Sequence, residues 1–185
     1  NKQLSFIGNV LLQIENIYEE LTKNLNVSYN NCSVTFPLNT QAIKFPEKTV
    51  REKGNCIELA LLFCSFLEAV GVNPLLILLP KESHAICGFS IMDGKTALCY
   101  ALETNLISKD NKFKVVLSAG EARLQKTGFL KEFKSGEFAK SINYQQKGIF
   151  YNKSALDIGL NEIIILDIKI LRVTGIYPVT LNPIV

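Results

Sequence analysis

Cys56, His84 and Glu103 are a nucleophile, a base and a carboxylate that together could cleave or transfer an acyl group. His84 is the only histidine in the chain, so any imidazole chemistry must fall on it. In such sites a thiolate attacks a carbonyl carbon, an imidazole moves the protons, and a carboxylate orients the imidazole. The three residue types predict a Cys-His-carboxylate site, provided that the surrounding elements bring them together.

Cys56 is predicted to lie at the first turn of a buried helix. Asn55 is a good N-cap, and Glu58, three residues later, completes the pattern of a capping box. The run from Cys56 to Val70 is almost wholly apolar and ends at Gly71, which is typical of a buried helix. Unpaired N–H groups and the helix dipole at such a start favour a thiolate and lower its pKa. We therefore assign Glu58 to capping and Cys56 to nucleophilic attack.

Hydrogen-bond donors must lie beside the nucleophile to hold the oxyanion of a tetrahedral intermediate. The backbone N–H of Cys56 is one candidate, and the side-chain amide of Gln41, in the preceding loop, is a second. A plain loop glutamine is an equally good interpretation of Gln41. Gly54 is expected to permit a tight turn and to leave room for a substrate. The alternative for Cys56 itself is an ordinary buried cysteine.

A β-hairpin is predicted to bring His84 beside Glu103. The runs 85–92 and 96–104 are strand-like and flank Asp93-Gly94, a typical pair for a two-residue turn. In that register His84 directly faces Glu103, with Cβ atoms about 4.5–5.5 Å apart on one face. A bulge or an odd-length loop would instead turn Glu103 away, and His84 would then be a structural histidine.

The remaining pattern indicates an α+β fold in one domain over residues 1–185. Apolar residues at three- and four-residue spacing predict an N-terminal helix over 4–25, which packs on the core or, alternatively, contacts a protein partner. A loop is predicted over 26–53, a buried strand over 75–79, a short strand over 113–117, and short helices and loops over 118–141. The segment 161–173 fits a strand and a helix equally well.

Composition predicts a folded globular chain. Its 185 residues are 48% hydrophobic and 20% charged, which is enough apolar mass for a core. The net charge of +3 is too small and too evenly spread to indicate a nucleic-acid partner.

Charged residues and proline interrupt the apolar stretches, so no membrane span is expected. The chain begins with Asn1 rather than Met, which is compatible with a domain excised from a longer protein.

The five cysteines argue against a structural metal site. No two of them have the C-x-x-C spacing, and a single histidine leaves zinc without clustered ligands. A disulfide framework is also unlikely in a chain of this size, so free thiols in a reducing, cytoplasmic-type compartment are expected. Two disulfides and one free catalytic cysteine would give the same count. The cysteines are Cys32, Cys56, Cys64, Cys87 and Cys99.

The amino-acid sequence around the candidate triad resembles bacterial members of the transglutaminase-like superfamily, which has the papain-like cysteine-protease fold. Such domains carry Gly-x-Cys at the start of a buried helix, His-Ala at the start of a strand, and an acidic residue on the next strand. The resemblance spans roughly residues 36 to 107. The segments that carry it are Phe45-Pro46-Glu47, Lys53-Gly54-Asn55-Cys56-Ile57-Glu58-Leu59-Ala60-Leu61-Leu62, Leu67-Glu68-Ala69-Val70-Gly71-Val72, Ser83-His84-Ala85 and Ala101-Leu102-Glu103-Thr104.

The resemblance implies a central helix that starts at Cys56 and packs on an antiparallel sheet. It also implies that Cys56 is the nucleophile, His84 the base and acid, and Glu103 the orienting carboxylate. This chain departs from the pattern in three ways. Many relatives have Asp in place of Glu103, and many have an aromatic residue where Ile86-Cys87 stands. The chain also has no Trp, which amine-transferring transglutaminases use to stabilise the oxyanion, so hydrolysis is favoured.

The expected function is therefore that of a cysteine peptidase or amidase. It would act on a protein or peptide substrate through a thioester acyl-enzyme, with no cofactor and no metal. Two alternatives remain open. One is acyl transfer from a protein glutamine to an amine, as in a transglutaminase. The other is a non-catalytic binding module on the same fold, because a fold does not fix a function.

Overall fold

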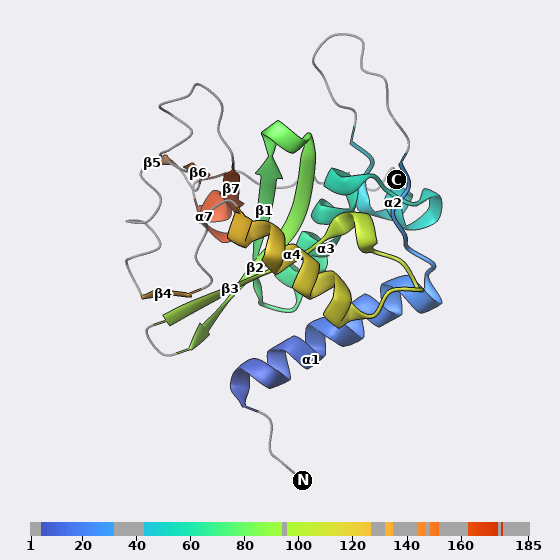
Figure 1. The fold of residues 1–185 in the computed structure, drawn as a ribbon, viewed down its shortest axis with the longest axis horizontal. Helices are drawn as coiled ribbons and strands as arrows, with labels where there is room; N and C mark the ends of the chain where they lie inside the picture. Colours follow the sequence, from blue (N-terminus) through green and yellow to red (C-terminus); the bar gives the residue numbers. More distant parts are fainter. Residues whose placement is uncertain are drawn as a thin grey trace, which may run out of the picture.

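The computed structural model of the chain describes residues 5–31, 43–93, 96–126, 132–134, 144–146, 149–151, 163–173 and 175 (Figure 1). Its helices are α1 (Phe6–Glu19), a π-helical turn η1 (Glu20–Asn24), α2 (Pro46–Glu52), α3 (Cys56–Ala69), the 3₁₀ turns η2 (Pro80–Glu82) and η3 (Thr104–Leu106), α4 (Phe113–Lys126) and α7 (Ile168–Val173). Its strands are β1 (Asn73–Leu79), β2 (His84–Asp93), β3 (Thr96–Leu102), β4 (Glu132–Lys134), β5 (Tyr144–Gln146), β6 (Ile149–Tyr151) and β7 (Ile164–Asp167).

The described strands form one antiparallel sheet in the order β4-β3-β2-β1-β7-β6-β5. Consecutive strands β1, β2 and β3 lie side by side in it, and β7 pairs with the other edge of β1. In the β1–β2 pair Leu79 lies opposite His84, so His84 opens β2 at the end of the sheet that β1 reaches last. The combination of helices with an antiparallel sheet confirms the predicted α+β class.

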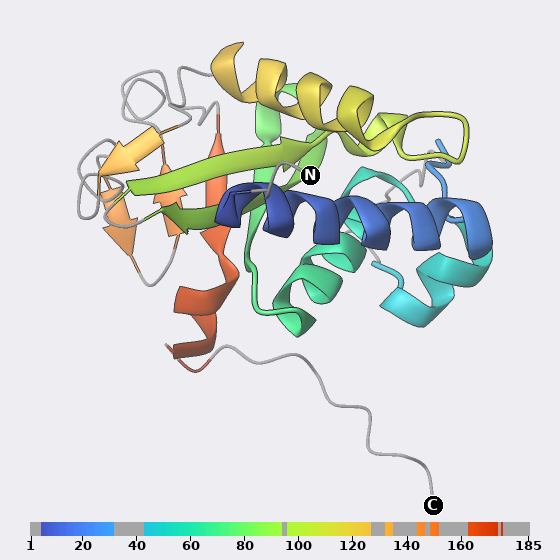
Figure 2. The same cartoon turned by 90° about the horizontal axis from the view of Figure 1, so that it is seen from below.

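Helices cover both faces of this sheet. Figure 2 shows α4 on one side of the strands and α1 and α3 on the other. Most of the larger core cluster joins α1 and α3 to the sheet and includes Ile14, Tyr18, Phe63, Leu67, Cys87 and Phe89. A second cluster fills the opposite face and includes Leu75, Ile77, Ile86, Ala101 and Leu124. The alternation of β2 between Ile86 and Cys87 follows from the two-residue period of a strand.

The N-terminal helix packs into the core, as the favoured interpretation of its apolar stripe predicted. Ile14, Tyr18 and Leu21 are each at most 1% exposed. The Tyr18 hydroxyl donates a hydrogen bond to the Ser108 carbonyl at 2.9 Å and lies 2.8 Å from that of Asn111. These contacts fix α1 against the loop that leads into α4. Contact of this helix with a protein partner remains a prediction.

Helix α2 was not predicted, and α4 was predicted only in part, because short helices were expected from residue 118 onward. Residues 46–52 form α2 within the predicted loop, where Pro46 occupies the first helical turn, a position that tolerates its missing N–H. The predicted strand at 113–117 is wrong because Phe113 begins α4. The buried residues of α4 follow helical spacing, and they are Phe113, Val116, Gly120 and Leu124. The ambiguous segment 161–173 contains both structures, β7 followed directly by α7.

The β2–β3 hairpin pairs two residues away from the predicted register. Asp93 lies opposite Thr96, so Asp93 belongs to the strand ladder and not to a turn at Asp93-Gly94. The last pair of the ladder is Cys87 with Leu102, and continuing it would put Ile86, not His84, opposite Glu103. A slip of one residue would reverse the faces, but a slip of two leaves every side chain on its original face.

No helix among the described residues is long and apolar enough to cross a bilayer.

Candidate active site

Cys56 is the first residue of α3, as predicted. The Asn55 side chain accepts a hydrogen bond from the Glu58 backbone N–H at 3.1 Å. The Glu58 carboxylate accepts one in return from the Asn55 N–H at 3.0 Å, which completes the capping box. These bonds use two of the unpaired donors of the first turn and fix where the helix begins. They hold a partly exposed Cys56 at the N-terminus of a helix that is buried on one side, while Ser65, Glu68 and Ala69 are exposed.

Glu58 is buried in this capping role. Its carboxylate also accepts the backbone N–H of Lys44 at 3.0 Å and pairs with the Lys44 ammonium at 3.4 Å. Its side chain therefore ties the segment before α2 to the start of α3. No oxygen of Glu58 contacts the His84 ring in the described hydrogen bonds, in keeping with its assignment to capping.

Gly54 has a different role from the predicted one. A Cβ atom at Gly54 would lie 2.7 Å from the Thr49 side chain and 3.2 Å from Glu58 and Leu59. The left-handed backbone conformation of this turn falls on Lys53, at φ 66°, and not on the glycine. The missing side chain therefore permits close packing of α2 on α3, where Thr49 is buried, and leaves no room for a substrate at this point.

His84 and Glu103 meet at the end of the sheet. The Nε2 atom of His84 lies 2.6 Å from Oε1 of Glu103, and the two side chains are 7% and 5% exposed. They are not opposed in the ladder, but the two-residue shift leaves them diagonal neighbours on one face. Diagonal neighbours lie about 7–8 Å apart, within reach of long side chains. The predicted pair is therefore present, through a register that differs from the predicted one.

The Glu103 carboxylate is held from several sides. It pairs with the guanidinium of Arg123 and accepts the Asn105 backbone N–H at 3.2 Å. Its own backbone N–H donates to the Val116 carbonyl of α4 at 3.1 Å. A Cβ atom at Gly120 would overlap the backbone of Ala101, so this glycine lets α4 lie directly on β3. The close packing places Arg123, one turn beyond Gly120, over the carboxylate.

Charge favours a thiolate at Cys56 and an imidazolium at His84. Burial raises the pKa of Cys56, but the hydrogen bond to His84 and the backbone N–H groups of Ala85 and Ile57 lower that pKa below its ordinary value. Burial disfavours the charged form of His84, but its bonds to Cys56 and Glu103, with their negative charges, raise its pKa to about 9. Because Nε2 faces Glu103, Nδ1 is the ring nitrogen left for Cys56.

The Glu103 carboxylate stays ionised beside this pair. Burial raises its pKa, yet the His84 bond and charge, the Asn105 N–H and the Arg123 charge together lower it. The Thr104 hydroxyl, next in the chain, donates to the Ala85 carbonyl at 2.7 Å. This bond fixes the start of β2, whose Ala85 N–H faces the Cys56 sulfur.

Sequence reasoning missed Arg123 and Tyr29. Arg123 joins Glu103 to Glu82 and could have been found only by placing 113–126 on a helix. Tyr29 lies beside the site because its segment pairs with Gly54, a tertiary contact without a local signal. Gln41 and Cys32 lie outside the described residues, so the predicted amide donor stays a prediction. The role of the Cys56 backbone N–H as an oxyanion donor also stays a prediction.

The other described cysteines are buried away from the site. The Cys64 and Cys87 sulfurs lie 3.7 Å apart between α3 and β2, as free thiols. Burial raises the pKa of Cys87 well above its ordinary range and, with the Asp167 charge, that of Cys99 to about 12. Within the described part of the chain, no group of three His, Cys, Asp or Glu side chains could hold a metal ion.

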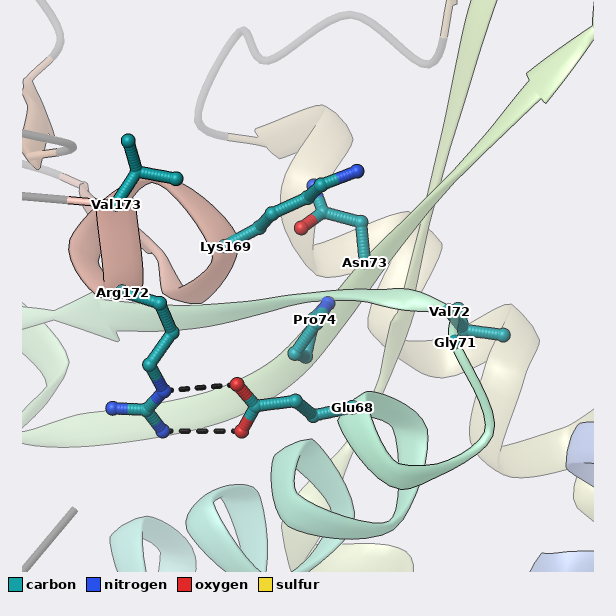
Figure 3. A pocket seen from close by; sticks show the side chains of 8 residues that line it. All are labelled: Glu68, Gly71, Val72, Asn73, Pro74, Lys169, Arg172 and Val173. Carbon is teal, nitrogen blue, oxygen red and sulfur yellow. Dashed lines mark hydrogen bonds and ion pairs between the residues drawn. The ribbon is translucent and has the colours of Figure 1, made fainter. Parts of the chain in front are cut away.

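A separate pocket of about 380 Å³ lies at the opposite end of β1 (Figure 3). Arg172 of α7 and Glu68 of α3 form a two-point ion pair across it, with distances of 2.8 and 3.1 Å. Asn73 lines the pocket at the first residue of β1, whereas His84 pairs with the last residue, Leu79. At about 3.3 Å per residue, these two positions are about 20 Å apart, so the pocket is distinct from the Cys56 site.

Cys56, His84, Glu103 and Arg123 form a continuous chain of alternating negative and positive groups. Such a chain can form a nucleophilic thiolate at neutral pH and deliver a proton from the imidazolium. Cys56 begins α3, His84 begins β2, Glu103 follows the last residue of β3, and Arg123 lies in the last turn of α4. Four regular elements therefore hold these side chains rigidly. No protein-family model, curated protein or solved structure matches the chain.

Proposed function

We propose that the chain is a cysteine hydrolase that cleaves an amide or peptide bond through a thioester acyl-enzyme. The observation that carries this proposal is the buried 2.6 Å contact between His84 and Glu103 beside Cys56 at a helix N-terminus. Buried groups with shifted pKa values that converge on a partly exposed thiol are typical of nucleophilic sites. A purely structural histidine does not require a reactive partner at a helix start.

The same proposal extends to the fold. The elements that carry Cys56, His84 and Glu103 follow one another as α3, β2 and β3, with β1 between the first two. Helix α3 packs on β1 and β2, and the strands are antiparallel. This order is the one that the resemblance to transglutaminase-like proteins implies. We infer a papain-like core of that type over the helix and the three strands.

Acylation begins with attack of the Cys56 thiolate on the substrate carbonyl carbon. The new S–C bond forms as the C=O π pair moves to oxygen, and backbone N–H groups at the start of α3 stabilise the resulting oxyanion. Collapse of this intermediate re-forms the C=O bond and breaks the C–N bond. The His84 imidazolium gives its proton to the departing amine, which leaves a thioester on Cys56 and a neutral imidazole.

Deacylation reverses the roles of the same groups. Neutral His84 takes a proton from water as the water oxygen attacks the thioester carbon. The C–S bond then breaks, and the Cys56 thiolate, the His84 imidazolium and a free carboxylic acid result. Glu103 holds the imidazole in one orientation and stabilises its charged form throughout both steps. Arg123 in turn orients Glu103, which keeps the buried carboxylate paired.

The test of this function is to trap the acyl-enzyme with p-nitrophenyl acetate, an activated ester. Attack by Cys56 releases p-nitrophenolate and leaves an acetyl group on the cysteine, which peptide mass spectrometry locates. Cys56→Ala should abolish acetylation and turnover and should leave the fold unchanged. Cys64→Ala is the matched control, because that thiol is buried in the same helix, and it should acylate normally.

The acceptor of the acyl group is tested in the same reaction. Water is expected to discharge the acetyl-enzyme to acetate, even when a labelled primary amine is present. Incorporation of the amine in preference to water would show acyl transfer instead of hydrolysis. A failure to acetylate Cys56 at all, in a folded chain, would contradict the proposal and favour a binding module.

A further inference from the structure

Tyr29 lies where the segments that carry the nucleophile and the carboxylate meet. Its segment forms a parallel bridge with Gly54, two residues before Cys56. The Asn30 N–H donates to the Gly54 carbonyl at 2.8 Å, and the Gly54 N–H donates to Ser28 at 3.3 Å. These bonds fix the position of the Tyr29 backbone beside Gly54, just before the first turn of α3.

A second backbone bond ties Tyr29 to the carboxylate side of the site. Its N–H donates to the Ile107 carbonyl at 2.9 Å, directly after the η3 turn that Glu103 caps. The Tyr29 ring packs at the edge of the larger core cluster and is partly exposed, like Cys56. The ring therefore lies against the core beside the segment that leads into Cys56.

The Tyr29 hydroxyl is a protonated donor at neutral pH. Burial raises its pKa, and the negative charges of Cys56 and Glu103 raise that pKa further. Its hydroxyl lies 3.4 Å from the Asn31 side-chain oxygen, longer than the 2.5–3.0 Å of a typical O–H···O bond. So long a bond is weak, and the hydroxyl is easily redirected to a stronger acceptor such as a new negative charge.

We propose that Tyr29 donates a hydrogen bond to the oxyanion that forms when Cys56 attacks a carbonyl. This role rests on the proposed function, which generates that oxyanion. The thiolate itself is stabilised by His84 and by the N–H groups of Ala85 and Ile57. Tyr29 therefore acts on the tetrahedral intermediate and not on the ionisation of the thiol, so the two effects can be separated by experiment.

The experiment compares two reactions of Cys56 in the full chain and in Tyr29→Phe. Acetylation by p-nitrophenyl acetate passes through a tetrahedral oxyanion, whereas alkylation by iodoacetamide is a direct displacement without one. Loss of one oxyanion donor costs about 10²–10³-fold in rate at an established site. We expect acetylation to fall by at least about tenfold, while the rate and pH dependence of alkylation stay unchanged.

Two control variants define the result. Tyr18→Phe removes a buried hydroxyl that bonds the Ser108 carbonyl, so it tests whether lost stability alone slows acetylation, and it should not. His84→Ala removes the partner of the thiolate and should slow both reactions together. A loss of acetylation alone indicates an effect on the oxyanion. A loss of both acetylation and alkylation indicates an effect on the thiolate.

Each remaining outcome overturns the proposal in a different way. If Tyr29→Phe acetylates as fast as the unmodified chain, Tyr29 has no role at the oxyanion, although the proposed function stands. If acetylation and alkylation slow by the same factor, Tyr29 acts through the thiolate or through the fold. If the unmodified chain forms no acetyl-Cys56, the proposed function fails together with the role of Tyr29.

Discussion

The Nε2 atom of His84 lies 2.6 Å from Oε1 of Glu103, with both side chains more than nine-tenths buried. Burying two charges is favourable only when further bonds satisfy them. Here Glu103 also receives Arg123 and the Asn105 N–H, and His84 receives Cys56. Charged side chains are thus paired without a break from Cys56 to Arg123 of α4, and each pair can be tested separately.

Glu103→Gln is expected to lower the pKa of His84 below its value of about 9. Glutamine can still accept a hydrogen bond but carries no negative charge, and that charge favours the imidazolium. His84 is the only histidine, so a single imidazole resonance in an NMR titration reports its pKa directly. Glu82→Gln is the matched control, because Glu82 pairs with the same Arg123. A His84 pKa that falls equally in both variants would contradict the direct link.

Gly120→Ala is expected to destabilise the fold and to slow acetylation of Cys56. The added methyl group would overlap the Ala101 backbone and press on the Glu103 N–H, so α4 must move away from β3. Overpacking of this kind costs about 1–3 kcal/mol, which urea unfolding measures. Ser118→Ala, at an exposed site on α4, is the control and should preserve both properties. Equal stability of the two variants would show that the close contact is not needed.

Glu58→Gln should leave acetylation of Cys56 unchanged. Glutamine at this position can complete a capping box as well as glutamate, and a capping residue takes no part in proton transfer. Glu58→Ala should instead lower the free energy of unfolding by about 1–2 kcal/mol, because buried N–H donors lose their acceptor. A large loss of acetylation in Glu58→Gln, without a loss of stability, would make this carboxylate part of the reaction.

Among the described cysteines, only Cys56 should react with iodoacetamide in the native state. Cys64, Cys87 and Cys99 are buried, and burial raises the pKa of the latter two. Peptide mapping after brief labelling, with a sample unfolded in guanidinium as the control, measures each site. Rapid native labelling of Cys64 or Cys87 would show that α3 opens away from β2.

The central elements of the site follow from local sequence patterns. Asn55 and Glu58 locate the start of α3, and the apolar runs locate β1, β2 and β3. The His84–Glu103 pair was predicted from a β2–β3 register that differs from the observed one by two residues. It survives because side chains alternate with a period of two, so an even error preserves the face. An error of one residue would have lost the pair.

The supporting elements depend on contacts that local patterns do not contain. The β-branched Val115 and Val116 favour a strand over 113–117, and only the later Gly120 and Leu124 reveal helical spacing. Once the first half of α4 is taken for a strand, Arg123 cannot be placed on Glu103. Tyr29 is likewise brought to the site by a bridge to a residue far along the chain, which no periodicity in its own segment indicates.

The pH dependence of iodoacetamide alkylation at Cys56, compared between the native chain and His84→Ala, tests whether Cys56 and His84 form a thiolate–imidazolium pair. The thiolate is the reacting form, and His84 lowers the pKa of the thiol by stabilising its charge. The native chain should therefore react with a midpoint below the free-cysteine value of about 8.5, and the midpoint should rise in His84→Ala. A midpoint near the free value that does not change in His84→Ala would contradict the ion pair and, with it, the proposed nucleophile.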